Sequence, residues 1–320
     1  MKDFNIDQIE DIDDIPPSYL RATINKIGGL EKWKRLMRGN FSVELKEAIR
    51  LLFDRNGRFI PFSALKIAIC DPNPNFHFKQ PEINYGEILE RIRRHLAVGL
   101  GQEPLDIGLA SVGEFEERTL AVKAKLDTDP RTINATKGIW LPIALPQLQL
   151  LLSENNGDYG ALLNQFVAGV ASAYAEDYPN RSFTNYRQND LTGNVSIFPG
   201  SRHDRLITEM VKGTVVGIVL LPFGGYSVNA CREIWSGHEL FSQILNRMFL
   251  GGGLDVAIAY MAFAKELCRD NNTPIVRCPA VNWRSYSLQF DADYDAASFD
   301  NTVHLVHTDG NYSGAVFCLG

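Results

Sequence analysis

The chain contains few cysteines and no long apolar run, which excludes several large classes of protein. Of its 320 residues, 5 are cysteines, an odd number, and no two of them form a Cys-x-x-Cys pair. They are Cys70, Cys231, Cys268, Cys278 and Cys318. Their wide spacing argues against a disulfide framework and against a structural zinc site. The longest apolar run, Thr214–Phe223, is about half the length that a membrane-spanning helix needs.

Targeting signals and biased composition are missing as well. The N-terminus lacks the basic, apolar and small-residue order of a signal peptide. Hydrophobic residues make up 45% of the chain and charged residues 22%, the fractions of an ordinary globular protein. We therefore predict a soluble protein of the reducing cytoplasm, with no membrane partner.

Charge is distributed unevenly along the chain. Residues 1–14 hold six acids and one lysine, a net charge of -5, so that only -1 of the total of -6 is left for the remainder. Residues 32–95 contain thirteen lysines and arginines against seven acids. Such a stretch suits an anionic partner, but it also suits solvated helix faces. Aromatic residues are rarely interleaved with these basic residues, and we predict no nucleic-acid partner.

The hydrophobic pattern predicts an α+β fold, with a mixed α/β arrangement as the alternative. Helical periodicity dominates the first hundred residues, most clearly at Tyr85–Val98. Strand and helix patterns then mix without regular βαβα alternation. We predict an acidic segment 1–15, a helical N-terminal region 16–105 and an α+β main domain 106–320 with a mixed, largely antiparallel sheet and packed helices. No linker marks these boundaries, so a single domain 1–320 stays open.

Strands in the main domain are predicted from alternation or from short apolar runs bounded by turn residues. These are Thr119–Leu126, Gly138–Leu145, Asn194–Phe198, Thr214–Leu221, Pro274–Cys278, Ser285–Phe290, Val303–His307 and Ala315–Leu319. Helices are predicted at Leu148–Ser153, Tyr159–Ala175, Leu206–Lys212, Ser227–Trp235, His238–Leu250 and Leu254–Arg269. Residues 251–253, all glycine, would then separate two helices. This argues against a phosphate loop, which follows a strand.

Cys231 is the first candidate catalytic residue. It follows a buried strand and a glycine turn and lies early in a predicted helix, where amide dipoles lower the pKa of a thiol. A cysteine nucleophile needs a base and an orienting group, and His307 and Asp309 follow on a predicted strand. This chain order resembles that of papain-like hydrolases, without their local glutamine- and tryptophan-bearing signature. A buried structural cysteine is the alternative.

His307 and Asp309 share one face of a regular strand, because residues two apart point the same way. The pair suits a general base with its orienting carboxylate, or two ligands of a metal ion. The spacing indicates no third ligand. We therefore predict that the protein holds no metal and needs no other cofactor.

The candidate substrate-binding residues begin with Arg202, His203 and Arg205. They lie in a polar turn before a predicted helix, where backbone amides and two guanidinium groups can hold a phosphate or carboxylate. Helix capping by Ser201 or Asp204 explains the same residues without a ligand.

Tyr226 and Trp283 complete the candidate site. Aromatic residues near loops can line a pocket for a flat substrate, although core packing is the alternative. Together these residues predict a cofactor-independent enzyme, a hydrolase or lyase, acting on a small organic or peptide-like substrate by a cysteine nucleophile or by His/Asp acid–base chemistry. The alternative function is a non-catalytic interaction protein whose acidic N-terminal segment docks on a partner. Whether the chain forms a homo-oligomer stays open.

Overall fold

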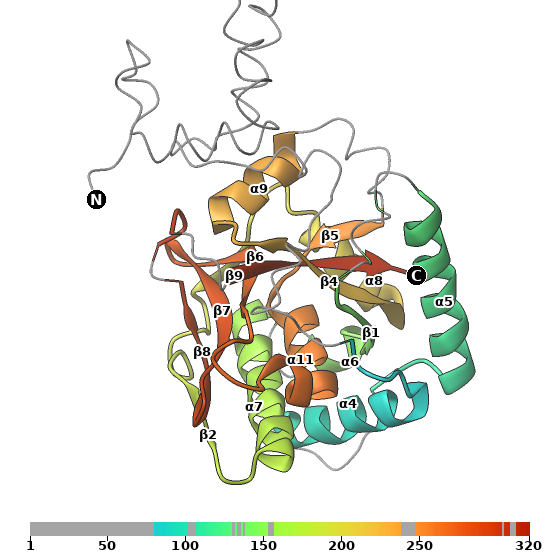
Figure 1. Ribbon diagram of the computed structural model, residues 1–320, viewed down its shortest axis with the longest axis horizontal. Helices are drawn as coiled ribbons and strands as arrows, with labels where there is room; N and C mark the ends of the chain where they lie inside the picture. The colour runs from blue at the N-terminus through green and yellow to red at the C-terminus, as the bar shows by residue number, and fades with distance from the viewer. Residues whose placement is uncertain are drawn as a thin grey trace, which may run out of the picture. The chain divides into compact units, whose positions relative to one another are not determined.

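The computed structural model describes residues 80–101, 107–129, 132, 136, 138–152, 157–237, 247–302, 304–307 and 312–320. All of them belong to one compact unit, Ile67–Gly320. They form seven helices and one sheet of nine strands (Figure 1). The predicted α+β class is confirmed. Residues 1–79 and 102–106 lie outside this description, so the predicted boundaries at 15 and 105 are not tested.

The sheet is mixed and largely antiparallel, as predicted. Its main order is β1-β4-β9-β6-β7-β8-β2, with β3 beside β6 and β5 beside β9. The strands are β1 (Trp140–Leu145), β2 (Ser182–Asn185), β3 (Val195–Ile197), β4 (Val215–Gly224), β5 (Met248–Leu250), β6 (Ile275–Trp283), β7 (Tyr286–Ala292), β8 (Ala296–Asn301) and β9 (Tyr312–Leu319). Two pairs are parallel, β6 with β9 and β2 with β8.

The last strand of the chain lies at the centre of the sheet. β9 is antiparallel to β4 along one edge, while its other edge pairs with β6 near Tyr312 and with β5 near Cys318. The sequence predicts antiparallel neighbours among the last strands, which holds for β6, β7 and β8. β9 leaves that order because its continuous apolar pattern suits a strand covered on both faces.

Helices cover both faces of the sheet (Figure 1). On one side lie α4 (Tyr85–Leu100), α7 (Tyr159–Asp177) and α11 (Gly253–Leu267), and on the other lies α9 (Val228–Gly237). α11 is buried along almost its whole length, as expected of a helix that is apolar all round. The remaining helices are α5 (Val112–Thr128), α6 (Gln149–Leu152) and α8 (His203–Lys212). Among the described residues, no helix combines the length and apolarity needed to cross a membrane.

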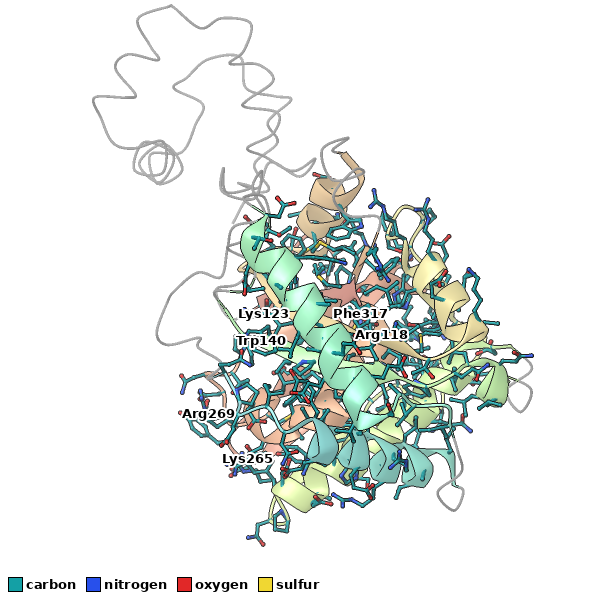
Figure 2. The ribbon with its side chains drawn as sticks, turned by 90° about the vertical axis from the view of Figure 1, so that its right-hand side faces the viewer. Arg118, Lys123, Trp140, Lys265, Arg269 and Phe317 are labelled. Carbon is teal, nitrogen blue, oxygen red and sulfur yellow. The ribbon has the colours of Figure 1, made fainter. Side chains whose placement is uncertain are left out.

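The predicted strand at Thr119–Leu126 is wrong, because these residues form the middle of α5 (Figure 2). A strand and a helix would both bury Val122 and Leu126, so the choice between them depends on the residues before Thr119. Phe115 adds a buried position one helical turn before Thr119, and the helix begins where Ser111 accepts a hydrogen bond from the Glu114 N–H. Further along α5, Lys123 lies over the ring of Trp140 of β1 (Figure 2).

Two other predicted elements differ at their ends. The predicted helix His238–Leu250 ends instead in β5, whose three apolar residues pair with β9, while residues 238–246 lie outside the description. Within the predicted strand Val303–His307, the described residues 304–307 form a turn, because the strand there, β8, ends at Asn301. β5 has only three residues, and so short a strand takes its conformation from its partner, β9, rather than from its own hydrophobic pattern.

Candidate functional site

Three helices begin side by side at one end of α11. The first residues of α7, α8 and α11 are Tyr159, His203 and Gly253. Tyr159 contacts both of the others: its Oη lies 3.0 Å from His203 Nε2 and 3.0 Å from the Gly253 nitrogen. Asp255, on the first turn of α11, completes a group that we call the Tyr–His–Asp cluster (Tyr159, His203 and Asp255).

The hydrogen bonds assign the protons in this cluster. Tyr159 Oη accepts the N–H of Gly253 and, at 3.4 Å, that of Leu254. The phenol proton is then left to donate to His203 Nε2, which places the imidazole proton on Nδ1. The two backbone donors lie at a helix N-terminus, where partial positive charge favours negative charge on the Tyr159 oxygen.

Asp255 lies on the other side of the imidazole. Its Oδ1 is 4.0 Å from His203 Nδ1, and both side chains are fully buried. The imidazole also has a hydrogen bond with the backbone of Leu250, and the Asp255 carboxylate accepts from the N–H groups of Gly252 and of its own turn. Among the described residues Asp255 Oδ2 has no partner of good geometry, and such a buried polar atom costs free energy.

Burial moves the pKa values of the three side chains away from their ordinary values. The pKa of His203 falls to about 4, because burial disfavours the charged imidazolium. The pKa of Asp255 rises to about 7, because burial disfavours the carboxylate more than the N–H groups of Gly252 and its own turn favour it. Burial also raises the pKa of Tyr159. A strongly perturbed group of this kind marks a candidate functional site.

The glycine run has a packing reason at its second position. A Cβ on Gly252 would lie 2.3 Å from two atoms of the His203 ring, so the imidazole needs a bare backbone there. The run follows strand β5 rather than a helix, which corrects the sequence argument against a phosphate loop. Its three N–H groups are nevertheless already used, by Ala315 O, Asp255 Oδ1 and Tyr159 Oη. The loop is therefore not a phosphate cradle.

Two arginines flank the buried histidine on the surface side. Arg202 is partly exposed and Arg205 is exposed. The backbone of Arg202 has φ of 62°, a left-handed conformation that costs free energy in a residue other than glycine. Burial and the charge of Arg205 lower the pKa of Arg202. The predicted capping residue Ser201 accepts the His203 N–H, and Arg202 itself occupies the N-cap.

Cys231 lies early in α9, as predicted, but its thiol is not activated there. The side chain is 1% exposed, and burial raises its pKa to about 12. The charges of Arg277 and Arg232 act in the opposite direction and do not overcome burial. The prediction of a lowered pKa is therefore wrong, because desolvation outweighs the helix dipole. The alternative of a buried cysteine fits this environment.

The other predicted residues gather loosely around Arg277. This fully buried arginine of β6 stacks on Tyr312 at 3.6 Å and donates to the backbone oxygen of His307 at 2.7 Å. The His307 side chain is exposed and lies in a turn, and Asp309 lies outside the described residues. Tyr226 is buried, and this burial raises the pKa of its phenol. The nearby Cys231 thiol raises that pKa further. The proposed pairing of His307 with Asp309 stays a prediction.

Trp283 lies at the far end of β6 from Arg277 and is part of the sheet's packing. Its indole N–H donates to Asp190 O at 2.8 Å, and the guanidinium groups of Arg187 and Arg284 both lie over its ring. The core alternative for this residue fits its 5% exposure.

Sequence reasoning missed Tyr159, Asp255 and Arg277. Each is a polar residue within or at the start of an otherwise apolar element, and this is the signal that was available. A buried polar side chain needs partners, which only the assembled fold supplies. Among the described residues, no group of three His, Cys, Asp or Glu side chains is placed to hold a metal ion. No protein-family model, curated protein or solved structure matches the chain.

Proposed function

We propose that this chain is a cofactor-independent enzyme that acts on a small anionic organic substrate by acid–base chemistry. The Tyr–His–Asp cluster transfers the proton, and Arg202 and Arg205 bind the anionic group. One observation carries the proposal: Tyr159 Oη lies 3.0 Å from His203 Nε2, and Asp255 lies behind the same imidazole. A hydroxyl that bonds an imidazole, with a carboxylate on the other side of that imidazole, is a frequent arrangement of acid–base groups.

The burial of the three side chains assigns their roles. Tyr159 is the least buried of the three side chains, although its hydroxyl is enclosed by its three hydrogen-bond partners, so we assign the contact with the substrate to Tyr159. His203 Nε2 takes the phenol proton as the Tyr159 oxygen takes a proton from a carbon next to a carbonyl group. The N–H groups of Gly253 and Leu254 stabilise the negative charge that develops on the Tyr159 oxygen. Above its raised pKa of about 7, Asp255 is ionised and stabilises the imidazolium, which returns the proton in the reverse step.

Solvent deuterium exchange tests this function before the full reaction is known. A panel of small carboxylates and phosphate monoesters, each with a C–H next to a carbonyl group, is incubated with the protein in D2O and followed by proton NMR. We expect the protein to accelerate exchange for at least one member. In Tyr159→Phe the acceleration falls about 100-fold or more, since a positioned acid–base group contributes about that much.

Tyr178→Phe is the matched control, because Tyr178 lies at the opposite end of α7 and donates only to the backbone oxygen of Lys265. Arg202→Gln raises the substrate concentration needed for half-maximal exchange and leaves the maximal rate nearly unchanged. Equal exchange by the protein and by Tyr159→Phe contradicts the proposal. So does the absence of catalysed exchange across the panel.

Two alternatives from the sequence have less support. Cysteine nucleophilic catalysis would need a reactive Cys231, whose thiol is buried and has a raised pKa. Docking through the acidic segment rests on residues 1–15, which lie outside the described residues and leave that function a prediction.

A further inference from the structure

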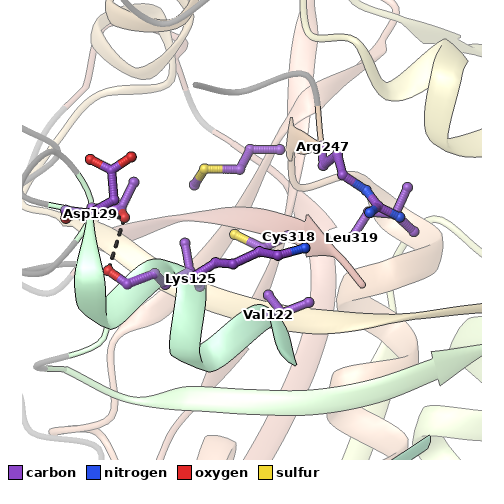
Figure 3. A pocket seen from close by; sticks show the side chains of 9 residues that line it. Val122, Lys125, Asp129, Arg247, Cys318 and Leu319 are labelled. Carbon is purple, nitrogen blue, oxygen red and sulfur yellow. Dashed lines mark hydrogen bonds between the residues drawn. The ribbon is translucent and has the colours of Figure 1, made fainter. Parts of the chain in front are cut away.

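A hollow of about 140 Å³ opens between α5 and the ends of β5 and β9 (Figure 3). Much of its lining is apolar. Val122 and Leu126 come from α5, Met248 from β5, and Cys318 and Leu319 from β9. An engineered apolar cavity of about 150 Å³ accepts a benzene molecule, so this hollow has room for an apolar body of that size.

Two cations lie at the hollow. The Lys125 side chain runs across Cys318 with its ammonium group toward the side of Arg247 (Figure 3). Arg247 Nη2 donates to the backbone oxygen of Gly320 at 2.6 Å, which orients the guanidinium group. Neither cation pairs with an Asp or Glu side chain among the described residues, and the bond of Arg247 to the Gly320 oxygen uses only one of its two terminal nitrogens. The Lys125 ammonium and the remaining N–H groups of Arg247 can therefore both donate to one bound anion.

The opposite end of the hollow has the opposite charge. Asp129 lines it there, away from Arg247 (Figure 3). The two cations lie at the other end, so the anionic group of a ligand belongs at the Arg247 end.

We propose that this hollow binds a small organic monoanion, with its carboxylate between Lys125 and Arg247 and an apolar body of about one aromatic ring against the apolar lining, which includes Val122, Met248 and Leu319. Such a carboxylate receives charge-assisted hydrogen bonds from both cations while the ring displaces water from the apolar lining. The site shares no residue with the Tyr–His–Asp cluster. A test of this site is therefore independent of a test of the proposed function.

The probe is 4-fluorobenzoate, titrated into the full chain and followed by fluorine NMR. A dissociation constant on the order of 1 mM is expected for a ligand with so few atoms. The ¹³C-labelled methyl group of Met248 reports the position, because Met248 lines the hollow while Met210 and Met261 are buried elsewhere in the core. Binding shifts the Met248 signal and leaves the Met210 and Met261 signals unchanged.

Variants test the two parts of the site. Arg247→Gln and Lys125→Gln should each weaken 4-fluorobenzoate binding about tenfold. The matched control is Lys123→Gln, since Lys123 is paired with Asp127 on the same helix and does not line the hollow. Val122→Phe fills the hollow and should abolish binding. Because Lys125 and Arg247 are exposed, their variants keep the fold even if Val122→Phe does not.

Uncharged 4-fluorobenzyl alcohol provides the last comparison. It should bind about tenfold more weakly than 4-fluorobenzoate, because it lacks the carboxylate. Equal affinity for the two probes overturns the proposal, as does unchanged binding in Arg247→Gln. An unmoved Met248 signal at probe concentrations of about ten times the expected dissociation constant also overturns it.

Discussion

At the scale of single residues, burial acts on His203 and Asp255 in opposite senses. The same loss of water lowers the pKa of His203 to about 4 and raises that of Asp255 to about 7. Between pH 4 and 7 both side chains are uncharged, and His203 is free to accept the hydrogen bond from Tyr159. The lowered pKa also makes His203 a weaker base, so the proposed proton transfer needs the ionised Asp255 that is present above pH 7 to stabilise the imidazolium.

The two shifts oppose each other in their effect on stability. As the pH falls from 6.5 to about 4, the unfolded chain protonates His203 and the folded chain does not, so the stabilisation by His203 is lost. As the pH rises from 3.8 to about 7, the folded chain keeps the Asp255 proton that the unfolded chain has released, so stability is lost in that direction. Between pH 4 and 6.5 the two contributions largely cancel.

Single variants should therefore reveal opposite pH dependences. Asp255→Asn leaves His203 alone, and its free energy of unfolding relative to the parent protein should rise by a few kcal/mol from pH 4 to pH 6.5. His203→Gln leaves Asp255 alone, and its free energy of unfolding relative to the parent protein should fall over the same interval. Urea unfolding at several pH values measures both. His95, another buried histidine of lowered pKa, is common to all the proteins and cancels. Parallel pH profiles for the two variants would show that the shifts are wrongly assigned.

At the scale of secondary structure, α4 and α7 are joined by both apolar packing and charge. Arg91 of α4 donates two hydrogen bonds to the Asp177 carboxylate, at 3.2 and 2.7 Å, and also contacts Glu176. The Arg91 and Asp177 side chains are each 13% exposed, so water screens this pair only weakly. The planar guanidinium group is matched to the carboxylate, and a lysine cannot reproduce that geometry.

Arg91→Lys should lower the free energy of unfolding by about 1 to 2 kcal/mol, because one of the two charge-assisted bonds to Asp177 is lost. Arg93→Lys is the control on the same helix. Its pair with Glu90 is 41% and 58% exposed, and such pairs contribute within about 0.5 kcal/mol. Urea unfolding at low and high salt compares the two. A larger effect of Arg93→Lys would contradict this ranking.

At the scale of the whole molecule, the final strand joins the parts of the sheet. β9 pairs with β4, β5 and β6, and Ala315, Val316 and Phe317 are fully buried between the covering layers. Without it, β4 and β6 would lose their shared neighbour. Residues 315–317 therefore complete the core, whereas the acidic segment 1–15 carries -5 of the net charge of -6 and has six apolar residues among its fifteen.

Removing residues 312–320 should prevent cooperative folding, because it deletes the strand between β4 and β6. Removing residues 1–15 should leave a protein that melts within about 5 °C of the full chain, since the segment is highly charged and is followed by Pro16-Pro17. Calorimetry and circular dichroism measure both. A fall of more than about 10 °C on removing 1–15 would make that segment part of the core and a poor docking tail.

The sequence alone determined the secondary structure of the long segments with a regular apolar pattern. Tyr85–Val98, Tyr159–Ala175 and Thr214–Leu221 match α4, α7 and β4, and the α+β class follows from them. For these segments each residue's hydrophobicity and its spacing agree on one structure, so no distant contact is needed to choose it.

The tertiary structure decided the short strands and the site. β5 is a strand because β9 lies beside it, and residues 119–126 are helical because Phe115 extends their buried stripe. His203 was a candidate from its polar surroundings, but Tyr159 and Asp255 join it from helices 44 residues before it and 52 after it. Desolvation sets the pKa values of Cys231 and His203, and desolvation depends on how many distant side chains exclude water. Local pattern carries no measure of that quantity, because burial belongs to the folded chain as a whole.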